Sequence, residues 1–139
     1  MRQATGMIVR RTPGPGLFDI TPEARTWAEE RARGADGLLT LFCRHSSASL
    51  TVQENADPDV RRDLEDAFAR LAPRGAGYRH AMEGPDDMPA HLRAVLSGVN
   101  VAVPLIGGRL ALGTWQAIYL WEHRDRPHRR EVALHLLWG

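Results

Sequence analysis

The pattern of apolar and polar positions divides the chain into three predicted helices and six or seven predicted strands. In two segments, apolar residues recur three or four positions apart, which is the spacing of an amphipathic helix, and a third helix is predicted from Pro89 at its start and Gly98 after its end. Other segments are short apolar runs, or alternate between apolar and polar residues, and are bounded by glycine, proline or charge, as strands are. The predicted helices span residues 21–33, 58–72 and 89–97, and the predicted strands span residues 5–11, 37–43, 48–55, 99–105, 109–112, 117–123 and 132–137.

Residues with known preferences for helix ends and turns support these boundaries. Thr21 and Asp57 are each followed by proline, which is the order expected for an N-cap and the first helical position. Asp87 lies two residues before Pro89 and is predicted to cap the third helix. The glycine pair at residues 107–108 predicts a tight hairpin between two strands.

The order of the predicted elements indicates the fold class. Several strands are joined by hairpins, and the helices are interspersed among them. This order favours an α+β fold, with a largely antiparallel two-layer sheet and about three helices, over a doubly wound parallel sheet. The 139 residues fit a single domain that spans the whole chain, residues 1–139. No glycine-rich dinucleotide or P-loop fingerprint is present.

Composition narrows the range of partners and locations. The formal net charge is +1, so neither nucleic acid nor an anionic membrane surface is favoured as a partner. The single cysteine, Cys43, cannot form an internal disulfide, and it lies inside an apolar strand, where a thiol is usually buried and inert. No signal peptide is evident, and no apolar run approaches the roughly 20 residues that span a bilayer. We expect a soluble, cytoplasmic protein that binds small molecules or other subunits.

Metal- and proton-handling side chains are concentrated in residues 78–92. This segment is predicted to run from a loop through a helix cap into the first turns of a helix. His80 would lie on the loop and His91 in the helix, so the two imidazoles can converge if the loop folds back. We expect this segment to be the chemical centre. Its titratable candidates are His80, Glu83, Asp86, Asp87 and His91.

Four stretches resemble the YjbQ-like family, in the family's order along the chain. They are residues 45–60 (HSSASLTVQENADPDV), 83–91 (EGPDDMPAH), 107–116 (GGRLALGTWQ) and 119–124 (YLWEHR). The resemblance implies a small α+β domain that assembles as a homotrimer, with sites near subunit boundaries and a metal held by histidines. It also implies the activity assigned to members of that family, secondary thiamine-phosphate synthase. The ending Leu136 to Gly139 differs from the glutamine- and acid-bearing ending expected of the family, so no role of the C-terminus is implied.

Three histidines are the predicted metal ligands: His45 at a strand end, His80 on a loop and His91 at a helix start. Imidazoles from separate elements suit a site with three protein ligands and one coordination position open for water or substrate. We expect a divalent cation, zinc or magnesium. The spacing matches no standard short zinc motif, so the alternative is that these histidines only hydrogen-bond loop backbone.

Carboxylates and hydrogen-bond donors elsewhere complete the predicted site. Asp86, Asp87 and Glu122 are predicted to orient a ligand histidine or to take a proton. Asp87 is equally well placed to cap the helix. Arg109 is predicted to neutralise a departing pyrophosphate, because its guanidinium is the only charged group among the residues predicted to donate hydrogen bonds to phosphate. For the clustered hydroxyls, the alternative is ordinary turn chemistry. The predicted phosphate-binding residues are Ser46, Ser47, Ser49, Asn55, Arg109, Thr114 and Gln116.

These candidates lead to three hypotheses for the function. The first is a transferase similar to secondary thiamine-phosphate synthase, which joins hydroxymethylpyrimidine pyrophosphate to thiazole phosphate and releases pyrophosphate. The second is a homotrimer that binds a metal or a phosphorylated metabolite without turnover. The third is metal-assisted hydrolysis of a phosphate ester. In each, the expected partner is a small phosphorylated metabolite, and the first is our leading expectation.

Overall fold

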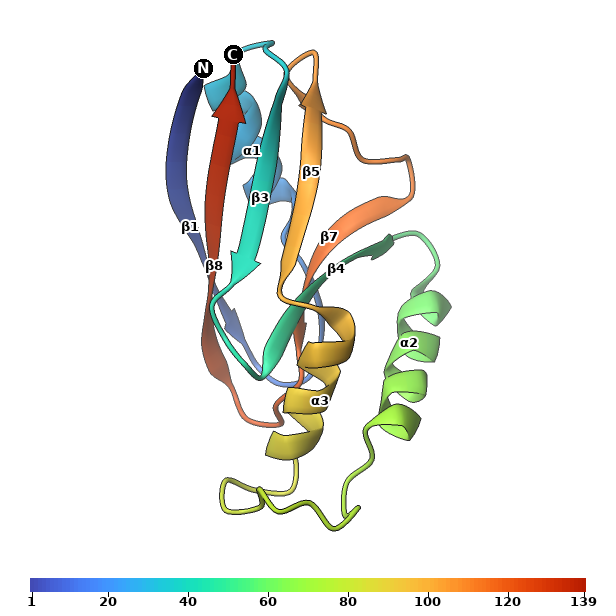
Figure 1. Ribbon diagram of the computed structural model, residues 1–139. Coiled ribbons are helices and arrows are strands. Elements are labelled where there is room, and N and C mark those ends of the chain that lie inside the picture. The colour runs from blue at the N-terminus through green and yellow to red at the C-terminus, as the bar shows by residue number, and fades with distance from the viewer.

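The computed structural model describes all of residues 1–139 and contains three helices and eight strands (Figure 1). The predicted α+β class, with antiparallel sheets and three helices, is confirmed. None of the helices combines the length and the apolar character needed to cross a membrane. The helices are α1 (Thr21–Ala32), α2 (Pro58–Leu71) and α3 (Asp87–Ser97). The strands are β1 (Arg2–Thr12), β2 (Gly16–Asp19), β3 (Gly37–Cys43), β4 (Ala48–Glu54), β5 (Asn100–Ile106), β6 (Arg109–Leu110), β7 (Gln116–Glu122) and β8 (His128–Trp138).

The strands form two sheets in which every pairing is antiparallel. The five-stranded sheet has the order β1-β8-β3-β5-β6, and the three-stranded sheet has the order β2-β7-β4. β8 begins at His128, earlier than predicted, because it pairs with β1 along the whole length of that strand. In the smaller sheet, Ala48 pairs with Glu122 at one end and Glu54 pairs with Gln116 at the other. This register decides which of the predicted site residues can meet.

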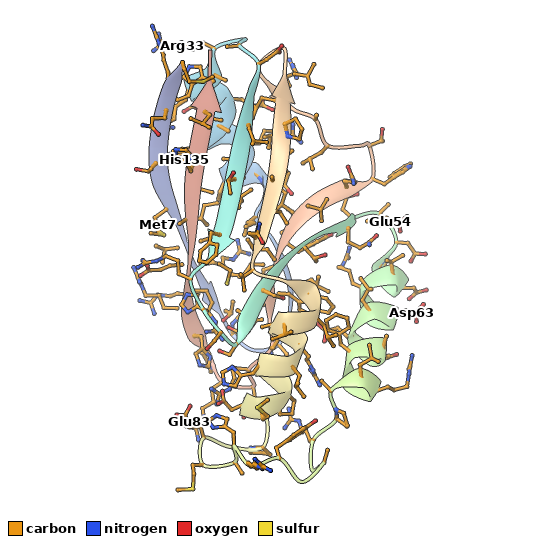
Figure 2. The ribbon with its side chains drawn as sticks, viewed as in Figure 1. Met7, Arg33, Glu54, Asp63, Glu83 and His135 are labelled. Carbon is orange, nitrogen blue, oxygen red and sulfur yellow. The ribbon has the colours of Figure 1, made fainter.

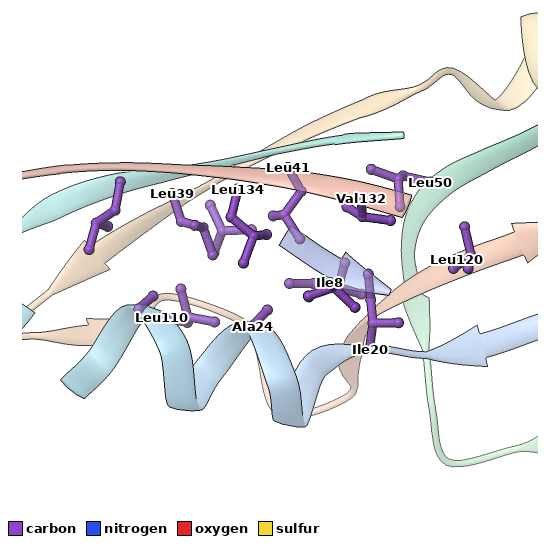
Figure 3. Close-up of a cluster of buried hydrophobic side chains, with 14 of the residues drawn as sticks. Ile8, Ile20, Ala24, Leu39, Leu41, Leu50, Leu110, Leu120, Val132 and Leu134 are labelled. Carbon is purple, nitrogen blue, oxygen red and sulfur yellow. The ribbon is translucent and has the colours of Figure 1, made fainter. Parts of the chain in front are cut away.

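The core lies between α1 and the inner face of the five-stranded sheet (Figure 3). α1 contributes alanines four residues apart, which share one face of the helix and let it approach the sheet closely. The sheet contributes alternate residues of β3 and β8, because successive side chains of a strand point to opposite faces. The main contributors are Ala24, Ala28 and Ala32 from α1, Leu39 and Leu41 from β3, and Val132, Leu134 and Leu136 from β8.

The opposite face of the five-stranded sheet is exposed and partly apolar. Met7, Val9, Leu38 and Phe42 are each between 40% and 49% exposed on β1 and β3. Figure 2 labels Met7 of β1 and His135 of the neighbouring strand β8. Contiguous apolar surface of this kind is typical of an interaction face. Within the chain, this face has no cover.

The predicted helix caps were partly wrong. Asp57 caps α2 as predicted, since its carboxylate accepts a hydrogen bond from the Asp59 N–H at 2.9 Å. The N-cap residue of α1 is Ile20, whose side chain makes no cap bond, and the Thr21 N–H donates to Asp19 Oδ1 at 2.8 Å. The Thr21 hydroxyl instead accepts a hydrogen bond from the Ile118 N–H at 2.8 Å, which ties the start of α1 to β7. Asp87 is the first residue of α3 and makes no cap hydrogen bond, because its carboxylate is bound elsewhere.

Candidate metal centre

His80, Asp87 and His91 meet at the N-terminal end of α3, near the bottom of Figure 1. Their ligand atoms all lie within 4.8 Å of one another. His80 Nε2 lies 2.6 Å from Asp87 Oδ2, and His91 Nε2 lies 3.1 Å from the same oxygen. Asp87 and His91 share one face of α3 because they are four residues apart. The loop that carries His80 folds back onto that face.

Arg124 holds Asp87 from the other side. Asp87 is 2% exposed, and its Oδ1 lies 2.7 Å from Arg124 Nη1. Burial by itself raises the pKa of Asp87, but the hydrogen bond from His80 and the charges of His91 and Arg124 outweigh it and lower that pKa below its usual value. Asp87 is therefore ionised, with one oxygen bound by Arg124 and the other facing two imidazoles.

A backbone carbonyl fixes the tautomer of His91. Its Nδ1 lies 2.8 Å from the carbonyl oxygen of Ser46. A carbonyl oxygen can only accept, so Nδ1 must carry a proton and donate it. In the neutral ring, Nε2 then has a lone pair that faces Asp87 Oδ2, which is also an acceptor. A cation between these two atoms, either a proton or a metal ion, is needed to make the contact favourable.

The structure does not bring His45 into this group. Its Nε2 accepts a hydrogen bond from the backbone N–H of Glu131 at 2.8 Å, which ties the bend after β3 to β8. Burial, and then the positive charge of Arg130, lower the pKa of His45 below its usual value. His45 therefore matches the alternative hypothesis, in which a histidine only forms a hydrogen bond to the backbone. The third donor of the centre is Asp87.

Glu122 lies outside the centre, in a buried ion pair. It is 0% exposed, and its carboxylate accepts hydrogen bonds from Arg130 Nε at 2.7 Å and from the Thr12 hydroxyl at 2.6 Å. The backbone N–H groups of His123 and Arg124 also donate to it. Burial raises the pKa of Glu122, but the bonds from Arg130 and Thr12 outweigh it and lower that pKa. The geometry therefore gives Glu122 a structural role, in place of the proton transfer predicted for it.

The predicted phosphate-binding residues lie in separate places, at the two ends of β4 and on β6 of the other sheet. β4 has seven residues, so its ends are about 20 Å apart at about 3.3 Å per residue. The strand starts just after Ser46, whose carbonyl meets His91. Its last residue, Glu54, lies well apart from Glu83 of the loop before α3 in Figure 2. The predicted residues at the Glu54 end are Asn55, Thr114 and Gln116, all exposed.

The three serines are near α3 or β7; the hydroxyls of Ser47 and Ser49 are engaged within the fold, whereas Ser46 is exposed and is bound only through its carbonyl. Ser46 gives its carbonyl oxygen to His91. The Ser47 hydroxyl accepts a hydrogen bond from Arg130 at 3.0 Å, and the buried Ser49 Oγ lies 2.8 Å from His123 Nε2. Arg109 is exposed on β6, the edge strand of the other sheet. Because β4 separates its two ends and Arg109 lies on the other sheet, a single chain does not bring the predicted residues together around one phosphate.

Sequence reasoning did not single out Arg124. This residue donates through Nε to Asp86 Oδ2 at 2.8 Å and also binds Asp87, so it aligns two consecutive carboxylates at the start of α3. Arg124 is the last residue of the fourth stretch that resembles the family, residues 119–124, and this position was the one feature of the sequence that could have marked it as a candidate. Cys43 was predicted correctly: it is 1% exposed, and burial raises the pKa of its thiol to about 11.

Comparison with known proteins identifies relatives along nearly the whole chain. The family described as UPF0047 protein YjbQ-like matches residues 6–138. The UPF0047 protein sll1880 of Synechocystis is 48% identical over 136 residues, which cover 97% of this chain and 92% of that protein. The UPF0047 protein YjbQ of Escherichia coli O157:H7 is 43% identical over 117 residues, which cover 84% of this chain and 85% of that protein. A YjbQ/UPF0047 protein of Clostridium acetobutylicum has a similar structure, with a TM-score of 0.86, 34% identity, and 94% and 98% of the two chains covered.

These comparisons correct the functional hypotheses. The family and these relatives are described without an activity, and a similar structure from Sulfolobus solfataricus is described as a protein of unknown function. The prediction of secondary thiamine-phosphate synthase activity was therefore wrong, and the comparisons support neither of its two alternatives. The matches do establish kinship over residues 6–138. The chain belongs to the UPF0047 (YjbQ-like) family.

Proposed function

We propose that this protein binds a divalent transition metal ion through His80, Asp87 and His91. The observation that carries the proposal is the contact between His91 Nε2 and Asp87 Oδ2 at 3.1 Å. In the neutral form of His91, whose Nδ1 donates to Ser46, two lone pairs face each other across this distance. A metal ion accepts both lone pairs and, once it replaces the proton between His80 Nε2 and Asp87, the lone pair of His80 Nε2 as well, so one ion binds three donors.

Zn²⁺ fits this donor set better than Mg²⁺. Imidazole nitrogen suits zinc and its neighbours in the transition series, whereas Mg²⁺ prefers oxygen ligands and several waters. Two further contacts have the form of groups that orient metal ligands. The Ser46 carbonyl fixes the ring of His91, and Arg124 fixes the carboxylate of Asp87.

Three protein ligands leave a coordination position for a small molecule or water. The side chains of His80 and His91 are 43% and 30% exposed, so an ion bound to them is accessible from solvent. We therefore assign the centre to a small-molecule site in which the metal contacts the ligand. The homotrimer implied by the resemblance stays a prediction, and the exposed apolar face of the five-stranded sheet supports self-association.

Metal content measured after zinc loading tests the proposal. The protein is loaded with Zn²⁺, dialysed against a weak chelator and analysed by elemental mass spectrometry. We expect about one zinc per chain in the wild type and almost none in a variant with both His80→Ala and His91→Ala. His135→Ala is the matched control, because His135 lies on the outer sheet face and bonds Gln3. Equal zinc content in the double variant and the control would contradict the proposal.

A further inference from the structure

Two pockets of different chemistry lie beside the loop that leads from His80 to α3. One, of about 490 Å³, is lined by parts of the segments 82–86 and 124–126. The other, of about 500 Å³, includes His80 in its lining. Gly84 and Pro85 line both pockets, so the loop between His80 and α3 separates them. Of the two linings, only the second includes a proposed metal ligand, His80.

The pocket beside His80 is uncharged. Its lining contains no carboxylate, lysine or arginine. The hydroxyl of Tyr78 already donates to the Pro73 carbonyl oxygen at 2.8 Å, so it is engaged within the loop. A phosphate group would find no cationic partner here apart from the metal. The side chains that shape the pocket belong to Tyr78, His80, Ala81, Pro85, Met88 and Pro89.

The pocket on the other side of the loop is polar, and most of its charged side chains are paired with one another or with Arg74. It contains three carboxylates and two guanidinium groups. Arg124 is already bound by Asp86 and Asp87. Asp125 forms an ion pair with Arg74. Because acidic groups outnumber basic ones and His80 is absent from this lining, the pocket favours neither an anionic ligand nor contact with the metal.

We propose that the pocket beside His80 holds the body of the metal's ligand, which is a small molecule with an apolar or aromatic body and a single metal-binding group, such as a carboxylate or hydroxamate. This inference rests on the proposed function. A volume of about 500 Å³ lies within the range of roughly 300–1,000 Å³ that is typical of small-molecule sites. Burial of a ring against Met88, Pro85 and Pro89 supplies the affinity, and the metal fixes the orientation.

Two hydroxamates test the inference, because they share one metal-binding group and differ in the body attached to it. The protein is loaded with Co²⁺, whose visible spectrum reports ligand exchange at the metal, and is titrated with acetohydroxamate and with benzohydroxamate. We expect benzohydroxamate to bind about tenfold more tightly, because its ring is buried in the apolar lining. Inorganic phosphate is expected to bind more weakly than either.

Replacement of one of two alanines by glutamine tests whether the preference for benzohydroxamate arises in this pocket. Ala81 lines the pocket and Ala76 does not, and both are exposed loop residues. Ala81→Gln should abolish the preference for benzohydroxamate without changing acetohydroxamate affinity, whereas Ala76→Gln should leave both affinities unchanged. Equal affinity of the wild type for the two hydroxamates, with cobalt bound, would overturn this inference alone. A protein that binds no cobalt would overturn the proposed function and this inference with it.

Discussion

Arg124 Nη1 lies 2.7 Å from Asp87 Oδ1, while Nε of the same guanidinium lies 2.8 Å from Asp86 Oδ2. One planar group thus holds two consecutive carboxylates at the start of α3. It leaves a single oxygen of Asp87 to face His80 and His91. The direction of the third metal donor is therefore set by a residue that is not itself a donor.

Replacement of Arg124 by lysine should weaken metal binding while the charge is kept. A single ammonium cannot hold Asp86 and Asp87 in the geometry of a planar fork. We expect Zn²⁺ affinity to fall about tenfold, as is typical when a group that orients a metal ligand is lost. Competition with a chromophoric chelator measures the change. Arg126→Lys in the same loop is the matched control, and equal affinities in the two variants would refute the positioning role of Arg124.

Glu122→Gln should destabilise the fold and leave metal binding intact. Glu122 and Arg130 are 0% and 4% exposed, and loss of one charge leaves the other buried without its partner. We expect the free energy of unfolding in urea to fall by about 3 kcal/mol, as is usual when a buried ion pair is broken. Zinc affinity, measured on the folded variant, should match the wild type. A large loss of affinity without a loss of stability would place Glu122 at the metal centre after all.

The stability of the metal-free protein should depend on pH through His123. In the folded protein, burial and the charge of Arg93 lower the pKa of His123 to about 3. In the unfolded chain, the pKa of a histidine is about 6.5. Between these values the unfolded chain binds more protons, so the free energy of unfolding falls as the pH decreases from about 6.5 toward 3. This contribution amounts to about 2 kcal/mol lost between pH 8 and pH 5.

His123→Gln removes that contribution, because glutamine does not titrate and still has groups that can bond Ser49. Urea unfolding at pH 8 and pH 5, in the presence of a chelator, measures the free energy of unfolding at each pH and so the difference between the two free energies. It should be smaller in the variant than in the wild type by about 2 kcal/mol. His135→Gln should behave like the wild type. If His123→Gln retains the full dependence on pH, other groups are responsible for it.

Local patterns predicted the elements of this fold well. β3 has the predicted bounds, Gly37 to Cys43, because a continuous apolar run between glycine and charge specifies one buried strand. The cap of α2 was also predictable, since Asp57 bonds a group only two residues away. The convergence of His80 and His91 followed from a turn signal and a proline close to both.

Contacts between distant segments were beyond local patterns. Nothing near Thr21 indicates that its hydroxyl would meet Ile118, and nothing near His45 indicates the N–H of Glu131. Both partners are fixed by which strands become neighbours. The same is true of Arg109, whose hairpin was predicted but whose position on an edge strand depends on the strand order. The sequence identified these residues as polar or charged candidates, but the groups that they contact depend on the order of the strands.

The hydrogen bond between His91 and the carbonyl of Ser46 limits what could be transplanted from this molecule. A peptide or a grafted loop comprising residues 78–92 would carry both imidazoles and the carboxylate. It would lack the carbonyl that selects the His91 tautomer and the guanidinium that turns Asp87, since Ser46 and Arg124 come from other parts of the chain. Engineers who borrow the segment would need a host that supplies substitutes for both.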